Sequence, residues 1–150
     1  MATTVRDYID KAKKVQSQIG GEIDKIVNSN KDEILDLNRE EQMFKKRINV
    51  NGSAFGIYAK SYKGIAKGYP KAQGTPYNLY KTGALYEGFN LLSKGNENKI
   101  IMDNSDSKKD IYKNLIGLTK ENQEVLNYEI IYPELMKFIK TYLWLNTMTA

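Results

Sequence analysis

LYKTGALYEGFNLL, residues 79–92, is the stretch around which the rest of the chain is organised. Gly83 supplies a backbone conformation that no other residue adopts at low cost, and Thr82 beside it is a candidate local cap. Residues 84–86 restart an apolar pattern that continues to residue 92. We therefore predict a turn and a short helix followed by a strand, which together join a mobile loop to a sheet.

Two short strands are predicted from this point, at residues 89–92 and 99–102. The residues between them, 93–98, are turn-forming types throughout. The two strands should therefore pair as an antiparallel hairpin.

Three aspartates follow the second strand: Asp103, Asp106 and Asp110. They superficially resemble an oxygen-ligand metal loop. The segment lacks the glycine and the closing glutamate of a calcium loop, and two lysines lie within it. We interpret it as a solvated turn and predict no metal site and no cofactor.

The C-terminal third predicts two further helices. Gly117 is a stop signal, and Thr119 is the predicted N-cap of the helix that follows. Pro133 either kinks this helix or occupies the first turn of the next. The last helix has a wide apolar face, which is typical of a core helix. Its apolar residues are Leu135, Met136, Phe138, Ile139, Tyr142, Leu143 and Leu145.

The N-terminal part predicts two helices, residues 4–27 and 31–44. Thr4 and Asp7 form a capping-box pattern, and Gly20-Gly21 allows a kink or a break in the first helix. The middle of the second helix, residues 38–42, is entirely polar. We interpret this polar middle as a solvated face, with a subunit contact as the alternative.

Residues 48–58 change period, because apolar residues alternate on both sides of Asn51-Gly52. This pattern predicts a β-hairpin arm. Residues 59–78 then show no clear periodicity and are rich in glycine, lysine and tyrosine. Since long unpatterned loops are usually functional, we expect this loop to become ordered against a partner.

Positive charge is concentrated before the central stretch. The chain has a net charge of +5, and no acidic residue lies between Glu41 and Glu87. The eight cations of this interval are Lys45, Lys46, Arg47, Lys60, Lys63, Lys67, Lys71 and Lys81, which leaves −3 for the rest of the chain. Interleaved tyrosines add stacking surface. The candidate contact residues are Lys45, Lys46, Arg47, Lys60, Tyr62, Lys63, Lys67, Tyr69 and Lys71.

This basic segment fits three hypotheses. Lysines and tyrosines suit a protein interface, and they could also follow a nucleic-acid backbone. A simple solvated loop is the third. No nucleic-acid-binding motif is present, so we favour contact with a protein surface.

Composition narrows the possible functions. The chain has 150 residues, which suits a single domain, 1–150, with the basic insertion at about 45–81. It has no cysteine and no histidine, so the commonest general base and the commonest metal ligands are missing, and we expect no enzyme. No signal peptide or membrane-spanning run is recognisable, which predicts a soluble protein made in the cytoplasm.

Three segments, taken in order, resemble a known group of proteins. They are LNREEQMF at 37–44, LYKTGALYEGF at 79–89, and IGLTKEN at 116–122 with YPEL at 132–135. In that order they resemble virion structural proteins encoded by tailed phages and prophages of Bacteroides-type gut bacteria. The Leu-x-x-Thr-Gly-x-Leu core, Leu79 to Leu85, is also similar to the neck and tail-completion proteins of long-tailed phages. The lysine-rich insert before Leu79 is longer than in the commoner pattern.

The resemblance implies a subunit of a six- or twelve-fold ring in the head-to-tail connector or tail of a virion. Such a ring would lie below the portal and surround the DNA channel. Heterologous contacts close into rings, and the hairpin at 48–58 and the loop at 59–78 are the candidate arms. The alternative is a small basic protein that binds DNA or assists its packaging.

The sequence therefore predicts an α+β fold. We expect a small antiparallel sheet, packed by a long N-terminal helix and by C-terminal helices, with an extended hairpin and loop arm. The predicted anchors of the loop on the core are Leu79, Gly83, Leu85 and Phe89.

Overall fold

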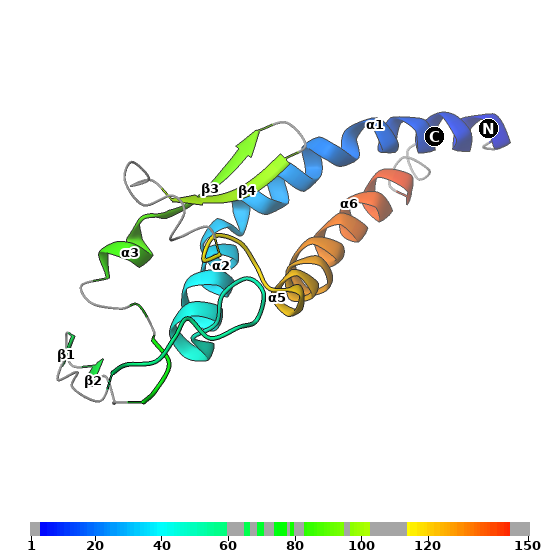
Figure 1. The fold of residues 1–150 in the computed structure, drawn as a ribbon. Coiled ribbons are helices and arrows are strands. Elements are labelled where there is room, and N and C mark those ends of the chain that lie inside the picture. The colour runs from blue at the N-terminus through cyan, green and yellow to red at the C-terminus, as the bar shows by residue number, and fades with distance from the viewer. Residues whose placement is uncertain are drawn as a thin grey trace.

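The computed structural model describes residues 4–59, 65–66, 69–70, 74–77, 79, 83–94, 97–102 and 114–144. Figure 1 shows a long N-terminal helix, a two-stranded sheet lying along it, and C-terminal helices that run back beside the first helix. The predicted α+β class is confirmed.

Helix α1, Val5–Ser29, is continuous and begins at the predicted capping box. The Thr4 hydroxyl accepts a hydrogen bond from the Asp7 amide, and the Asp7 carboxylate accepts one from the Thr4 amide at 2.7 Å. Gly20 and Gly21 neither end nor break the helix. A side chain at Gly21 would meet open space, so this glycine costs helix propensity without serving a close contact.

The second predicted helix is formed by two elements, α2 Lys31–Asp36 and the π-helical η1 Leu37–Lys46. Asn30 lies between α1 and α2 and carries no side-chain cap. Arg47 ends η1 in the left-handed conformation, with φ of 57°. Wider π-helical turns are rare and often occur at functional positions.

The predicted hairpin is confirmed. Strand β3, Phe89–Lys94, pairs antiparallel with β4, Glu97–Met102, and Phe89 lies opposite Met102. The short helix α3, Ala84–Glu87, precedes it and starts at Gly83, whose φ is 90°. The turn, helix and strand therefore follow in the predicted order, while Thr82 lies outside the described residues.

The predicted β-arm at 48–58 is only partly formed. Asn51-Gly52 does turn the chain, and the Asn49 side chain accepts hydrogen bonds from the amides of Asn51 and Ser53. Pairing between the two sides of this turn is limited to one bridge, Ile48 with Ala54. Residues 56–58 pair instead with residues 74–77, so the prediction of a hairpin is wrong for the second half of this segment.

Two other strands are described in the basic loop. They are β1 Ile65–Ala66 and β2 Tyr69–Pro70, which pair antiparallel. In Figure 1 this pair lies at the opposite end of the molecule from the N-terminus of α1.

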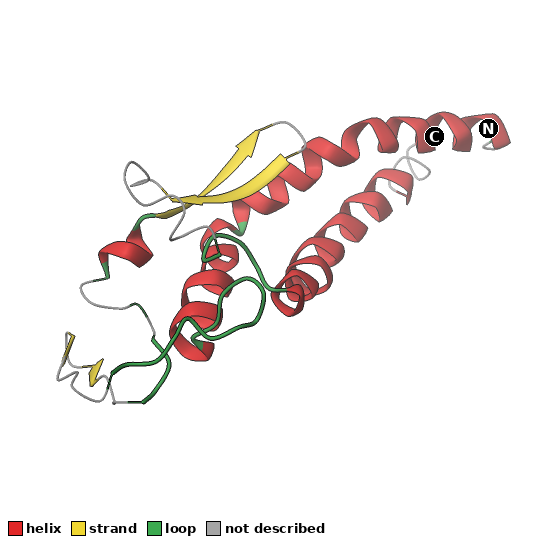
Figure 2. Ribbon diagram, in the orientation of Figure 1, coloured by secondary structure: helices red, strands yellow, loops and turns green. Residues whose placement is uncertain are grey.

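The C-terminal helices follow one another without a gap (Figure 2). They are α5 Lys120–Val125, the π-helical η2 Leu126–Ile131, and α6 Tyr132–Trp144. Thr119 caps α5 as predicted, and Pro133 occupies the first turn of α6. Helix α6 runs antiparallel to α1, with the Lys14 ammonium 5.9 Å from the centre of the Tyr142 ring.

Two apolar clusters form the core. The first joins η1, α3 and β3, and its buried members are Leu35, Met43, Tyr86, Phe89 and Leu115. The second joins α1, α2 and η2 through Val27, Ile34 and Ile130. Leu91 packs against both clusters, so the hairpin connects the two halves of the core.

Candidate interaction surface

The two amide residues of the polar middle of η1 are buried, so the prediction of a solvated face is wrong for them, whereas Glu40 is exposed and Arg39 and Glu41 are half-buried. Asn38 and Gln42 are both 0% exposed. The Asn38 amide nitrogen donates to the carbonyl oxygen of Leu115, at 3.0 Å, and to that of Gly117. The Gln42 side chain donates to the Gly117 carbonyl at 3.2 Å and accepts from the Thr119 amide at 2.8 Å. The contact is therefore within the chain.

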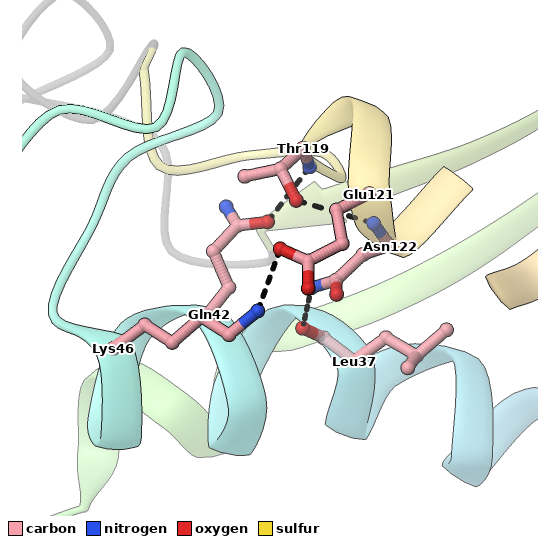
Figure 3. Close-up of polar contacts among 6 residues, drawn as sticks. All are labelled: Leu37, Gln42, Lys46, Thr119, Glu121 and Asn122. Atoms are coloured by element: carbon pink, nitrogen blue, oxygen red, sulfur yellow. Dashed lines mark hydrogen bonds and ion pairs between the residues drawn. The ribbon is translucent and has the colours of Figure 1, made fainter. Parts of the chain in front are cut away.

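Thr119 and Asn122 complete this set from the other side (Figure 3). The Thr119 hydroxyl accepts from the Asn122 amide at 3.3 Å, and the Asn122 side chain donates to the Leu37 carbonyl at 2.7 Å. We name Asn38, Gln42, Thr119 and Asn122 the polar clasp. It satisfies backbone groups that would otherwise be buried unpaired, so it fixes α5 on η1.

The orientation of Asn38 follows from its partners. Its side-chain oxygen is buried without a hydrogen-bond partner. Reversing the amide would place that oxygen against two carbonyl oxygens, which is worse than leaving one acceptor unpaired. Position 38 therefore requires a side chain with an NH₂ donor, which asparagine supplies.

A sequence signal for the clasp existed. Asn38 and Gln42 are four residues apart, and Leu35 and Met43 lie on the same helical face. Both amides thus occupy positions of the apolar stripe. Amide side chains in a stripe indicate buried hydrogen bonding, whereas a solvated face would have placed them opposite Leu35 and Met43.

The first three predicted contact residues all engage groups of their own chain. Lys45 pairs with Glu41, one helical turn earlier, and this hydrogen bond raises the pKa of the Lys45 ammonium. The Lys46 ammonium lies 2.7 Å from the Glu121 carboxylate at the rim of the clasp (Figure 3). The Arg47 guanidinium donates to the Pro76 carbonyl at 3.1 Å. Lys45 and Lys46 remain exposed at their heads, as surface pairs usually do.

The other predicted contact residues belong to the basic loop. Lys60, Tyr62, Lys63, Lys67 and Lys71 lie outside the described residues, and Tyr69 is described only as part of β2. The structure therefore describes the two ends of the loop.

Those two ends are held together by backbone hydrogen bonds. The Tyr58 amide donates to the Thr75 carbonyl at 3.0 Å, the Gly74 amide to the Tyr58 carbonyl at 2.9 Å, and the Tyr77 amide to the Gly56 carbonyl at 2.9 Å. The rings of Tyr58 and Tyr77 meet edge to face with centroids 4.6 Å apart. We name residues 56–58 with 74–77 the loop base.

Gly56 is required in the loop base on two grounds. Its φ of 130° is a conformation that side chains rarely adopt, and a β-carbon there would lie 2.8 Å from the Tyr77 ring. Together with the Arg47 contact to Pro76, this packing gives the basic loop a firm attachment to the body.

The predicted anchors lie at the first core cluster. Phe89 is buried within it, and Leu79 and Leu85 pack against it. Gly83 is buried and supplies the left-handed residue before α3. Leu79 itself has a positive φ of 57°, which is uncommon for a leucine.

An apolar hollow of about 250 Å³ lies between α1, the hairpin and η2. Its lining includes Ile23, Leu91 and Leu126, and the Asn98 side-chain oxygen is buried nearby without a hydrogen-bond partner. The lining is mostly apolar, with Asn98 and Gln123 as its amide residues, and it suits hydrocarbon side chains better than a charged substrate.

The remaining charged groups with shifted pKa values lie on the surface. Hydrogen bonds from Thr4 lower the pKa of the Asp7 carboxyl, and the Lys99 ammonium lowers that of Glu97. Within the described ranges, no three acidic side chains gather closely enough to hold a metal ion. Asp103, Asp106 and Asp110 lie outside those ranges.

Comparisons of the chain with protein-family models, with curated proteins and with solved structures found no match. Among the residues that the structure describes, no helix combines the length and the apolar composition needed to cross a membrane.

Proposed function

We propose that this chain is a non-enzymatic structural subunit of an oligomeric ring in the head-to-tail connector or tail of a tailed-phage virion. It would be made in the host cytoplasm and would join the portal and capsid to the tail around the DNA channel. No cofactor is assigned to it.

One observation carries the proposal: parts of the three segments on which the resemblance depends lie against one another in the fold. The polar clasp joins residues 37–44 to residues 116–122. Phe89 and Leu85, from residues 79–89, pack with Leu35 and Met43 in the first core cluster. Segments that are distant in sequence and adjacent in the fold support a resemblance between whole domains, because chance matches to separate turns need not meet.

The loop base gives a second line of support. It attaches a lysine-rich loop to the body through backbone hydrogen bonds and the Arg47 contact. An arm presented from a firm base can reach a neighbouring subunit without the cost of ordering its whole length. In the proposed ring, Lys60, Lys63, Lys67 and Lys71 meet acidic partner surfaces or channel DNA.

A second candidate function is a small basic protein that binds DNA or assists its packaging. It is favoured by the eight cations between Glu41 and Glu87, where no acidic residue lies. Such binding would depend on phosphate contacts and would therefore weaken steeply as salt rises.

The mass of the purified chain in solution, at low and high salt and with and without DNA, separates the two functions. The ring predicts a discrete oligomer, or a monomer that joins an assembly when portal or neck proteins are added. Contacts with an apolar centre should persist at high salt. A monomer that binds DNA tightly at low salt and releases it at high salt would replace the ring with the DNA-binding function.

A further inference from the structure

The N-terminal end of α1 exposes large apolar side chains. Val5 is 77% exposed, Tyr8 is 52% exposed and Ile9 is 48% exposed. They continue the apolar stripe that further along the helix is buried at Val15. We name residues 4–14 the tip. A stripe that continues past its covered part is a candidate contact surface.

Apolar groups are also exposed in η2 and at the start of α6, at the other end of the antiparallel helix pair α1 and α6. Tyr128 in η2 is 70% exposed and Tyr132 at the start of α6 is 56% exposed. A hollow of about 520 Å³ lies beside Tyr132 and Met136 on the outer side of α6. We name residues 120–136 the foot. No residue of α6 is fully buried among those described, so this helix has apolar surface left to cover.

The tip and the foot of one chain cannot cover each other. Helices α1 and α6 run antiparallel, and Lys14 lies beside Tyr142. Ile9 is five residues beyond Lys14, and Tyr128 is fourteen residues before Tyr142, in the opposite direction. At a rise of about 1.5 Å per residue, these distances place Ile9 and Tyr128 roughly 25–30 Å apart.

Charge makes the two surfaces complementary. Residues 4–14 contain four basic and two acidic side chains, a net charge of +2. Residues 120–134 contain four acidic side chains and one basic, a net charge of −3. Lys46 pairs with Glu121, and Lys137 and Lys140 line the hollow, which leaves the exposed Glu124, Glu129 and Glu134 as the acidic groups beside Tyr128 and Tyr132. Opposite net charges favour contact between tip and foot over contact between two tips or two feet.

We propose that the tip of one copy docks on the foot of the next copy, in a head-to-tail contact. Val5, Tyr8 and Ile9 pack against Tyr128, Tyr132 and the hollow beside them, and the basic tip faces the acidic foot. Because the two surfaces differ, a docked pair of copies keeps one free tip and one free foot, and the contact repeats until a ring closes. The biological setting of this contact rests on the proposed ring function.

The test uses two variants of the full chain, Ile9→Asp in the tip and Tyr128→Asp in the foot. Both positions are exposed, so folding should be unchanged, and circular dichroism checks this. Each variant alone should lose the oligomer and run as the 17.2 kDa monomer. An equal mixture should form a species of twice that mass, because the intact tip of Tyr128→Asp meets the intact foot of Ile9→Asp. The matched control is Ile57→Asp, since Ile57 is 60% exposed and belongs to the loop base, away from the tip and the foot.

The outcomes separate the contact from the function. Variants that assemble like the unmodified chain overturn the contact and leave the ring standing. Monomeric variants that do not pair on mixing indicate a two-fold contact and overturn the head-to-tail arrangement. Loss of the oligomer only in Ile57→Asp assigns the contact to the loop base instead. An unmodified chain that stays monomeric at every concentration overturns the self-contact, and the DNA and salt series then decides the ring function separately.

Discussion

Two helical segments of this molecule reverse the usual relation between polarity and burial. In η1 the polar Asn38 and Gln42 are completely buried, whereas at the start of α1 the apolar Val5 and Ile9 are largely exposed. The difference lies in what each segment faces. Residues 115–119 present backbone carbonyl and amide groups that bond to the side chains of η1, while the apolar stripe of the tip extends beyond its covered part. Whether a side chain is buried therefore depends on the surface that it faces. Its polarity determines only whether that surface must offer hydrogen-bond partners or apolar contacts.

The substitution expected to have the largest effect on stability is Asn38→Asp, in the buried polar part of η1. It replaces a donor by a carboxylate that faces the carbonyl oxygens of Leu115 and Gly117 in a buried site. We expect a loss of about 3–5 kcal/mol of unfolding free energy at neutral pH, as for other uncompensated buried charges. Urea unfolding measures it.

The pH dependence of this variant identifies the cause. Burial and the two carbonyls should raise the pKa of the new carboxyl above its unfolded value of about 3.9. The folded state then holds a proton that the unfolded state loses, so the deficit relative to the unmodified chain should grow as pH rises through that value. Asn127→Asp, at an exposed position of η2, is the control. Equal deficits in both variants would contradict a role for burial.

The second prediction concerns Gln42→Ala. The change leaves the Thr119 amide and a share of the Gly117 carbonyl without a partner, and it opens space inside the core. We expect a loss of about 2–4 kcal/mol, from unsatisfied buried groups and the cavity together. Gln123→Ala removes a comparable hydrogen bond, from the exposed Gln123 side chain to the Leu118 carbonyl, and should cost less than about 0.5 kcal/mol. If both glutamines cost the same, the clasp does not hold α5.

Two substitutions along α1 compare the stability contributed by the covered part of its apolar stripe with that contributed by the exposed part. Val15 is 6% exposed and Ile9 is 48% exposed on the same apolar stripe. Val15→Ala should lose about 1–2 kcal/mol, because it removes buried methyl groups. Ile9→Ala should stay within about 0.5 kcal/mol when the unfolding is measured on dilute, monomeric chain. A larger loss at Ile9 than at Val15 would mean that the tip is covered within its own chain.

The sequence was sufficient for elements whose partners are local. The caps at Thr4 and Thr119 and the pairing of residues 89–92 with 99–102 depend on neighbours that are close in sequence, and all three were predicted correctly. The turn between the strands is shorter than predicted, because residues 93–94 and 97–98 belong to the strands. Residues 56–58 and the amides of the clasp depend on partners 16 to 85 residues away. When a polar stretch of sequence is considered without the rest of the fold, water is the simplest hydrogen-bond partner to assume. For this reason a solvated face was predicted for Asn38 and Gln42.

The smallest expected effect is at the capping box, where an exposed polar contact starts the same helix that carries the exposed tip. The Asp7 carboxyl has its pKa lowered from the ordinary 3.8 chiefly by hydrogen bonds from Thr4. A lowered pKa in the folded state means that the carboxylate stabilises the helix start fully above pH 3.8 and loses this effect as pH falls through the lowered value. In Thr4→Ala, carbon NMR of the Asp7 carboxyl should show its pKa return toward 3.8. Glu97 is the internal control, because its lowered pKa depends on Lys99 on the hairpin and should not move. A pKa of Asp7 that stays low in Thr4→Ala would assign the shift to the backbone amide of residue 4, which this variant keeps, and to Lys11, rather than to the Thr4 hydroxyl.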